Sequence, residues 1–358
     1  MSEAKRVVIV GVGLIGGSVG LALKQQGWEV VGVDVDAERL KRALELNAID
    51  SVATIDQAGP CQLAVVATPV DHVVGTVERL LAAGAEVVTD VGSVKGPVAS
   101  AIDDHRFVAG HPMAGSEQDG IDGATPLLFS GATWVLCPTA KTDDDAFVTV
   151  RDVVVGFGAN PIAMEPDRHD QLVAVVSHVP HLTAATLMGL ADGRAVEHRA
   201  LLRLAAGGFR DMTRIAAGHP AIWPDICVQN ADAIVDVLDQ LIAELSDVRT
   251  VVAGRDRQGL LQRLETARSA RRNLPTTAPS TDAMSEMRVP IQDRRGELAT
   301  LVALAAELDV NIYDLEIAHS TEGPRGVAVL IIETAVADRL LTGLIDRGYR
   351  PSLRAIDS

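Results

Sequence analysis

A glycine-rich turn near the N-terminus restricts what this chain can fold into more than any other feature of its sequence. Residues 7–10 form a short β-branched run, and Gly11, Gly13 and Gly16 follow it in the spacing G-x-G-x-x-G. In a βαβ unit the first glycine permits a tight turn, the second lets a pyrophosphate approach the backbone, and the third packs the helix on the sheet. The helix N-terminus offers unpaired N–H groups and a favourable dipole to the phosphates. The segment therefore predicts a dinucleotide-binding unit.

An acidic residue stands where such a unit contacts the ribose of its cofactor. Asp34 follows a second apolar run, residues 29–33, and lies about 20 residues after the first glycine. A carboxylate at this position accepts hydrogen bonds from ribose hydroxyls and would repel a 2′-phosphate. We therefore expect NAD, rather than NADP, as the cofactor.

Further apolar runs extend this unit into a sheet. They alternate with helical segments and lie at residues 63–67, 86–89 and 133–136. The alternation predicts an α/β fold with a Rossmann-type, doubly wound parallel sheet. We expect Leu14 and Ile15, at the start of the first helix, to lie beside the cofactor. Thr68 follows a strand and either lies beside the cofactor or belongs to a simple turn.

Two polar motifs follow later strands of the predicted sheet. Residues 90–95 read DVGSVK and residues 110–117 read GHPMAGSE. A lone histidine more often has a structural role, but His111 lies in a loop bounded by glycine and proline after a short apolar run, and such loops concentrate function. Ligands of doubly wound sheets bind at the carboxyl ends of the strands. We therefore expect Ser93 and His111 at the ligand-binding edge.

From about residue 167 the pattern becomes helical, which predicts an all-α second domain. His178 and His181 are three residues apart and can share one helical face. They could hold a metal ion, but no carboxylate or third histidine stands at ligand spacing. We therefore expect no metal and interpret both as the lining of a substrate pocket. Arg210 and Arg214, four residues apart, form either a substrate-binding pair or a solvated face.

Taken in order, these segments resemble the prephenate/arogenate dehydrogenase family. The motifs are GVGLIGGS, DVGSVK, GHPMAGSE, SHVPH and FRDMTR, and the resemblance covers about residues 5–250. The histidine and arginine motifs are more specific than the glycine fingerprint. The resemblance implies NAD-dependent oxidative decarboxylation of prephenate to 4-hydroxyphenylpyruvate in tyrosine biosynthesis, or the same reaction on arogenate, its amino counterpart.

The resemblance also implies roles for individual residues. His111 corresponds to the catalytic base, and Ser93 to the serine that hydrogen-bonds the reacting hydroxyl and orients the histidine. Arg214 corresponds to the arginine that binds a substrate carboxylate.

Other positions correspond to the wall and the mouth of the pocket. His178 and His181 correspond to pocket-lining histidines, and we place Arg210 among the substrate-binding residues. Glu117 and Asp211 match residues of an ionic network near the pocket mouth.

Two other functions compete with this interpretation. A β-hydroxyacid dehydrogenase would carry a catalytic lysine on its helical domain, and the sequence has none at a matching place. A non-catalytic sensor of NAD and an amino acid is conceivable because of the C-terminal segment described next. Retention of both Ser93 and His111 argues against a sensor, since a sensor needs no base.

The C-terminal segment follows a linker rich in proline, threonine and serine. Its pattern of apolar runs predicts a β-α-β-β-α order, typical of a small ferredoxin-like α+β unit, and it resembles an ACT domain. ACT domains commonly bind amino acids, so the resemblance implies feedback by tyrosine through Asp293, Gly296 and Asn311. A purely structural or dimerising appendage is the alternative.

We divide the chain at these changes of pattern. The expected domains are a dinucleotide-binding domain (1–166), a helical substrate and dimerisation domain (167–273), a linker (274–284) and an ACT-like regulatory domain (285–358). A stripe of apolar residues spaced four and three apart on one long helix suits either a core or a homodimer interface. It consists of Ile234, Leu238, Leu241, Leu245, Val248 and Val252.

Composition excludes several partners and compartments. The formal net charge of −16, with no large basic block, argues against nucleic-acid binding. Three widely separated cysteines form neither a disulfide framework nor a zinc pattern, which favours a reducing cytoplasm. We find no signal-peptide pattern, and we expect no apolar run to approach the roughly 20 residues that a membrane helix requires.

Overall fold

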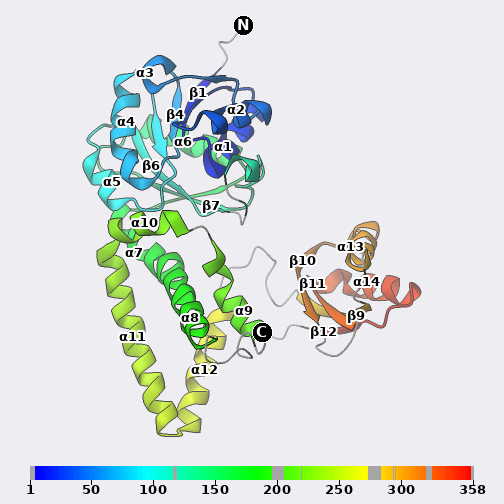
Figure 1. The fold of residues 1–358 in the computed structure, drawn as a ribbon. Coiled ribbons are helices and arrows are strands. Elements are labelled where there is room, and N and C mark those ends of the chain that lie inside the picture. The colour runs from blue at the N-terminus through cyan, green and yellow to red at the C-terminus, as the bar shows by residue number, and fades with distance from the viewer. Residues whose placement is uncertain are drawn as a thin grey trace. The chain divides into compact units, whose positions relative to one another are not determined.

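The computed structural model describes most of the chain as two compact units. The described residues are 5–115, 118, 120–195, 205–218, 220–272, 284–292, 294, 296–319 and 325–355. The first unit is Met1–Arg255 and the second is Asp256–Ser358. Figure 1 shows both units.

An eight-stranded sheet forms the centre of the N-terminal part of the first unit (Figure 1). Its strands are β1 (Arg6–Val10), β2 (Glu29–Val33), β3 (Ser51–Val52), β4 (Leu63–Val66), β5 (Val88–Asp90), β6 (Phe107–Pro112), β7 (Thr133–Cys137) and β8 (Asn160–Ala163). Their order is β3-β2-β1-β4-β5-β6-β7-β8. The sheet therefore has the doubly wound order that the alternating pattern predicted, with β3 and β8 as two strands that the pattern did not single out.

The prediction of a wholly parallel sheet was wrong at one edge. The strands from β3 to β6 in the sheet order pair in parallel, but β7 pairs antiparallel with β6, and β8 pairs in parallel with β7. Parallel neighbours normally need a crossover helix, whereas antiparallel neighbours do not. The described residues between β6 and β7 contain one short helical turn, η2 (Ile121–Gly123), so this connection reverses the chain direction.

Helices cover both faces of the sheet, which explains why its central strands are apolar throughout. These helices are α1 (Leu14–Gln25), α2 (Ala37–Glu45), α3 (Ile55–Ala58), α4 (Val73–Ala82), α5 (Gly96–Ala101) and α6 (Asp144–Gly156). Along β1, Val7 and Ile9 enter one buried cluster while Val8 and Val10 enter the other. Successive side chains of a strand point to opposite faces, so a strand covered on both faces reads as a continuous apolar run.

The helical part of the first unit begins directly after the sheet. Its elements are α7 (Pro166–Val173), the π-helical turn η3 (Ala174–His178), α8 (Val179–Ala195), α9 (Gly207–Thr213), η5 (Arg214–Ala217), η6 (Pro220–Ile222), α10 (Trp223–Gln229) and α11 (Ala231–Ala253). Ile234 on α11 packs against Ala174 and Val179 in a small buried cluster. In Figure 1, α8 and α11 run side by side below the sheet.

The apolar stripe of α11 divides into two halves. Ile234 is buried, and Leu238 and Leu241 are partly buried against the same cluster. Leu245 and Val252, further along the helix, are each 56% exposed. The first half of the stripe is therefore intramolecular core, and the second half presents apolar side chains at the surface of the single chain.

The expectation about membrane helices was also wrong in one respect. The segment Pro166–Gly193, which runs through α7, η3 and α8, is long and apolar enough to cross a membrane by length and composition alone. Its N-terminal half, however, carries His169, Asp170 and His178, which are buried in the protein and hydrogen-bonded to residues of other elements. These contacts join the N-terminal half of the segment to the sheet of the same unit.

The second unit contains a four-stranded antiparallel sheet and the helices α12 (Arg257–Arg272), α13 (Glu297–Glu307) and α14 (Thr334–Asp346). Its strands are β9 (Met284–Gln292), β10 (Ile312–His319), β11 (Arg325–Glu333) and β12 (Ser352–Ala355), in the order β10-β11-β9-β12. The expected β-α-β-β-α order is present and continues into β12. Met287, Leu301 and Leu340 are central to its own apolar core.

Candidate active site

The glycine-rich turn has the geometry that its spacing predicted. Gly11 has a φ of +91°, and its N–H donates to the carbonyl of Val33 at 2.8 Å. A Cβ on Gly11 would lie 2.3 Å from the carbonyl oxygen of Ala67, and one on Gly16 would lie 1.9 Å from that of Gly11. Both positions therefore require glycine, because the turn is tight at the first and α1 packs against the turn at the second.

The same turn leaves room and unpaired groups for a dinucleotide. A Cβ on Gly13 would meet nothing within 4 Å, and α1 begins at the next residue, Leu14, without a side-chain cap on its N–H groups. The side-chain oxygen of Thr68, which follows β4, is buried and has no hydrogen-bond partner among the described residues. Open space above a helix N-terminus and an unpaired buried hydroxyl fit the pyrophosphate and ribose of NAD.

Asp34 lies just beyond the carboxyl end of β2, as expected, and it has partners within the protein. Its carboxylate accepts hydrogen bonds from the backbone of Val12 and of Asp36, both at 2.9 Å. Arg39, on α2, contacts both of its oxygens at 3.1 Å. The Asp34 side chain is 3% exposed while that of Arg39 is 41% exposed. The carboxylate therefore joins the glycine-rich turn to α2 at the expected ribose site.

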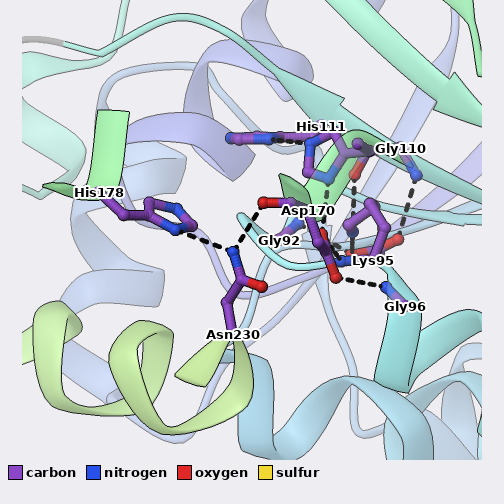
Figure 2. Close-up of polar contacts among 10 residues, drawn as sticks. Gly92, Lys95, Gly96, Gly110, His111, Asp170, His178 and Asn230 are labelled. Atoms are coloured by element: carbon purple, nitrogen blue, oxygen red, sulfur yellow. Dashed lines mark hydrogen bonds and ion pairs between the residues drawn. The ribbon is translucent and has the colours of Figure 1, made fainter. Parts of the chain in front are cut away.

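His111 lies near the end of β6 and contacts a second histidine (Figure 2). Residues 111 and 112 are still part of the strand, paired with β7, so the expectation that His111 lies in a loop was wrong. Its Nδ1 is 2.8 Å from Nε2 of His169 on α7, and the two rings meet edge to face. Nδ1 of His169 is in turn 2.7 Å from Oδ1 of Asp170. A buried carboxylate thus connects through one imidazole to the expected catalytic base.

The carboxylate of Asp170 is fixed at the start of α5. The backbone N–H of Lys95 donates to its Oδ1 at 2.8 Å, and that of Gly96 donates to its Oδ2 at 2.7 Å. A Cβ on Gly96 would lie 3.0 Å from Oδ2, so glycine allows this close approach. Asp170 is 6% exposed. These bonds join the helical region to the ligand-binding edge of the sheet and give the carboxylate a single orientation.

A buried ion pair lies beneath the histidines. Lys95 and Asp90 are both fully buried, and the ammonium of Lys95 contacts Oδ2 of Asp90. The Lys95 ammonium also donates to the carbonyl of Gly110 at 2.9 Å, and the N–H of Gly110 donates to Oδ1 of Asp90 at 3.1 Å. The pair therefore holds the end of β5 and the residue immediately before His111 in register.

The surroundings of His111 favour its neutral form. Burial is the largest cause that holds the pKa of His111 well below its ordinary value of 6.5, and the nearby His169 and the ammonium of Lys95 lower this pKa further. The imidazole is therefore uncharged near neutral pH and has a lone pair available for a hydrogen bond. This is the state that a general base needs before it accepts a proton.

His178 and His181 meet at one aromatic side chain, as their shared face predicted. His181 stacks on Trp223 with ring centroids 3.6 Å apart, and His178 meets the same indole edge to face at 6.2 Å. His178 is buried, and burial lowers its pKa to about 4. Burial also lowers the pKa of His181. Asn230 donates from its amide nitrogen to Nδ1 of His178 at 3.1 Å.

The other expected site residues lie outside this buried cluster. Ser93 is half-buried in the turn between β5 and α5, and no described hydrogen bond joins it to His111. Arg210, Asp211 and Arg214 are exposed on α9 and η5. Glu117 lies outside the described residues. The structure therefore brings the histidines together in the buried cluster, and the two arginines lie at exposed positions of α9 and η5.

The motif patterns did not single out several residues of the site. His169 and Asp170 precede the SHVPH motif by seven or eight positions, and Asn230 and Trp223 lie in α10 and the turn after it. His169 and Asp170 carry no local signal of burial, because α7 (PDRHDQLV) is mostly polar. Their partners come from β6 and α5, distant in the sequence, and no local pattern reveals such pairing.

Among the described residues, no three or more histidine, cysteine, aspartate or glutamate side chains are grouped so that they could hold a metal ion. Nδ1 of His178 and both ring nitrogens of His169 already have hydrogen-bond partners. Hydrogen bonds between members of the polar cluster therefore account for these three ring nitrogens.

Comparisons with known proteins agree with this architecture. A family model described as "Prephenate dehydrogenase, nucleotide-binding domain" matches residues 19–163, and one described as "Prephenate dehydrogenase, dimerization domain" matches residues 165–266. Prephenate dehydrogenase from Bacillus subtilis (strain 168) is 35% identical over 334 residues, which is 90% of each chain.

Solved structures show the same similarity. One is prephenate dehydrogenase from Aquifex aeolicus in complex with hydroxyphenyl propionate and NAD+, with 29% identity and a TM-score of 0.71, covering 76% of this chain and 99% of that one. Another is Synechocystis arogenate dehydrogenase, also 29% identical, with a TM-score of 0.65, covering 74% and 98% of the respective chains.

Proposed function

The chain belongs to the prephenate dehydrogenase family, and we propose that it oxidatively decarboxylates prephenate to 4-hydroxyphenylpyruvate with NAD, on the way to tyrosine. The observation that carries this proposal is the neutral, partly buried imidazole of His111 at the edge of the sheet where the glycine-rich turn also lies. A base at that position suits the removal of a proton from a ring hydroxyl during oxidation.

The reaction assigns one event to each group. The glycine-rich turn would hold NAD, which would accept the hydride that leaves C4 of the substrate ring. His111 takes the hydroxyl proton, so that C4 becomes a carbonyl carbon. The bond between C1 and its carboxylate then breaks, CO2 leaves, and the electron pair of that bond enters the ring. The ring becomes aromatic as the carbonyl electron pair moves to the C4 oxygen, which regains the proton from His111. The pKa of His111 favours the unprotonated base before this step.

The remaining site residues anchor and enclose the substrate in this proposal. Arg214 binds a substrate carboxylate, because a guanidinium fork matches the geometry of a carboxylate. Ser93, near the end of β5, hydrogen-bonds the reacting hydroxyl and helps to orient His111. Support for both roles comes from the family motifs and from their positions near the sheet edge or on η5.

The wall and mouth of the pocket complete the assignment. His178 and His181 line the pocket around Trp223, and Arg210 supplies further positive charge to an anionic substrate. Glu117 and Asp211 form an ionic network at the mouth. These roles follow the family resemblance, and the shared contact with Trp223 supports the pairing of the two histidines.

Domain division and assembly follow from the same family. We assign residues 1–166 to NAD binding, 167–273 to substrate binding and dimerisation, 274–284 to a linker and 285–358 to regulation. The exposed Leu245 and Val252 on α11, within the matched dimerization domain, support a homodimer. Such an enzyme, with a small soluble substrate, suits the cytoplasm. A monomer in sedimentation velocity at micromolar concentration would contradict the assembly.

Within the second unit, residues 285–358 form an ACT-like domain in this proposal. Its order of strands and helices, β-α-β-β-α-β, and its antiparallel sheet support this assignment. Gly296, with a φ of +87°, precedes α13, and Asn311 precedes β10. We place a tyrosine effector at these residues and at Asp293, which lies outside the described residues. Deletion of residues 283–358 should abolish inhibition by tyrosine, whereas an unchanged inhibition curve would place the effector elsewhere.

Arogenate is the second candidate substrate, because a solved arogenate dehydrogenase is also similar to this chain. The deciding experiment follows NADH absorbance with purified protein, NAD and either prephenate or arogenate. Turnover of prephenate alone establishes the proposed reaction, and turnover of arogenate alone reassigns the substrate. If folded protein that binds NAD turns over neither, the dehydrogenase proposal fails and a sensor function takes its place.

A further inference from the structure

Asp170 contacts both histidine systems of the site through two different chemical groups (Figure 2). Its side-chain carboxylate meets His169, which meets His111. Its backbone carbonyl accepts a hydrogen bond from Asn230 at 2.9 Å, and Asn230 meets His178. All but His111 are at most 6% exposed. Water therefore does not compete for these hydrogen bonds, and their donors and acceptors must match within the protein.

The first chain of bonds fixes the tautomer of His111. An ionised carboxylate only accepts, so the Nδ1 of His169 that faces Asp170 carries the hydrogen. The other ring nitrogen of His169, Nε2, then serves as the acceptor in this chain of hydrogen bonds. Because this Nε2 lies 2.8 Å from Nδ1 of His111, the latter nitrogen donates. His111 therefore has its hydrogen on Nδ1, and its Nε2 has a free lone pair.

The second chain fixes the opposite tautomer in His178. A backbone carbonyl only accepts, so the NH2 group of Asn230, not its oxygen, faces Asp170. The same nitrogen lies 3.1 Å from Nδ1 of His178 and supplies its second hydrogen there. Nδ1 of His178 is therefore an acceptor, and its hydrogen lies on Nε2.

We propose that Asp170 and Asn230 are positioning residues that give the two imidazoles opposite polarity, with Nε2 of His111 accepting and Nε2–H of His178 donating. The identity of the ligand rests on the proposed function. A substrate bound between these rings presents its reacting hydroxyl to His111 and an accepting oxygen, from a carboxylate or carbonyl, to His178. A substrate turned the other way would place donor against donor and acceptor against acceptor, which costs binding free energy.

Histidine tautomers can be measured without any substrate. In ¹⁵N NMR spectra of protein with labelled histidine, protonated and unprotonated ring nitrogens have well-separated chemical shifts. Signals are assigned by their loss in His111→Asn and His178→Asn. We expect Nδ1 of His111 and Nε2 of His178 to be the protonated nitrogens. The same tautomer in both rings would overturn the proposal.

Substitutions at His169 and Asn230 test the two chains of hydrogen bonds separately. His169→Leu should release His111 from its tautomer and leave His178 unchanged. Asn230→Leu should do the reverse. His169→Gln, whose amide oxygen can reach the position of Nε2, should keep the hydrogen on Nδ1 of His111. A His169→Leu protein in which His111 remains fully protonated on Nδ1 contradicts the proposal. If that variant does not fold, the wild-type spectrum and Asn230→Leu still decide.

Turnover gives a second reading of the same variants. With His111 no longer held in one tautomer, kcat for His169→Leu should fall about tenfold, the loss expected for one hydrogen bond, and His169→Gln should recover most of it. The positioning role and the proposed function can be contradicted separately. Opposite tautomers in a protein that does not oxidise prephenate would leave the positioning role and remove the proposed function. Full turnover by a protein with both hydrogens on Nε2 would remove the positioning role alone.

Discussion

The buried histidine network and the arginine-bearing segment of α9 and η5 differ in almost every physical respect. His169, Asp170 and Lys95 are buried and hydrogen-bonded to residues of other elements. α9 and η5 contain no buried residue, and Arg210 and Arg214 are exposed. Groups that move protons must be pre-oriented and desolvated, whereas groups that capture an anionic substrate must first meet it in water. The difference suggests that chemistry and capture are assigned to separate regions.

Loss of the base should give the largest effect on catalysis. His111→Asn should lower kcat by about 10²–10⁴-fold, because the positioned base is removed while the substrate contacts remain. The same substitution at His105, whose side chain is 65% exposed just before β6, is the control and should change kcat little. Steady-state kinetics with NAD in excess measures both. A larger change in KM than in kcat would assign His111 to substrate capture and remove the contrast between the regions.

The buried ion pair should dominate stability. Lys95→Met leaves Asp90 charged and unpaired in the interior, so the free energy of unfolding should fall by about 3–5 kcal/mol. Lys141 and Asp103 form an exposed pair at 2.5 Å, and Lys141→Met should cost no more than about 1 kcal/mol. Urea denaturation compares the two variants. Equal losses of unfolding free energy in the two variants would show that burial does not increase the contribution of an ion pair to stability.

The buried His178 should make stability depend on pH. Its pKa falls from 6.5 to about 4 on folding, so the unfolded chain binds the proton first as the pH drops. The free energy of unfolding therefore decreases below about pH 6.5, by about 2 kcal/mol at pH 5. His178→Gln should lack this part of the loss. Denaturation of both proteins at pH 7 and pH 5 tests this, and identical pH dependence would contradict the burial of a neutral imidazole.

The exposed arginine should have the smallest effect. Arg214→Ala should raise the KM for prephenate about tenfold and change kcat little, because a partly solvated charged hydrogen bond is lost from binding. Arg151→Ala, exposed on α6 beside Asp152, is the matched control. A fall in kcat comparable to that of His111→Asn would show that Arg214 acts in the chemical step, and the proposed division between regions would be wrong.

Local sequence patterns predicted the first part of the fold well, because close contacts between backbone segments restrict which residues can stand at a position. Gly11 and Gly16 have no room for a Cβ, and Asp34 follows the strand that the turn contacts. The apolar run of β1 reflects helices on both faces of the sheet. The antiparallel direction of β7 could not be predicted from a local pattern, since it depends on how the connection after β6 folds back.

The site could be predicted only in part, because sequence motifs include some of its residues and not others. His111, His178 and His181 belong to recognisable motifs, and the structure places the last two against Trp223. Most hydrogen-bond partners of His169, Asp170 and Asn230 lie more than 50 residues away in the sequence. His111 and His169, for example, are 58 positions apart. Sequence spacing does not show which buried polar groups meet across elements.

The sequence by itself determined the dinucleotide-binding turn, the parallel pairing of the central strands and the identity of the expected base, because each depends on short-range geometry, on the alternation of strands and helices or on a motif. Only the tertiary structure decided which groups surround that base. Burial forces every polar atom to find a partner, and the available partners are set by the packing of α7 and α10 against the sheet. The hydrogen-bond polarity of the two histidines is therefore a property of the folded protein and not of either motif.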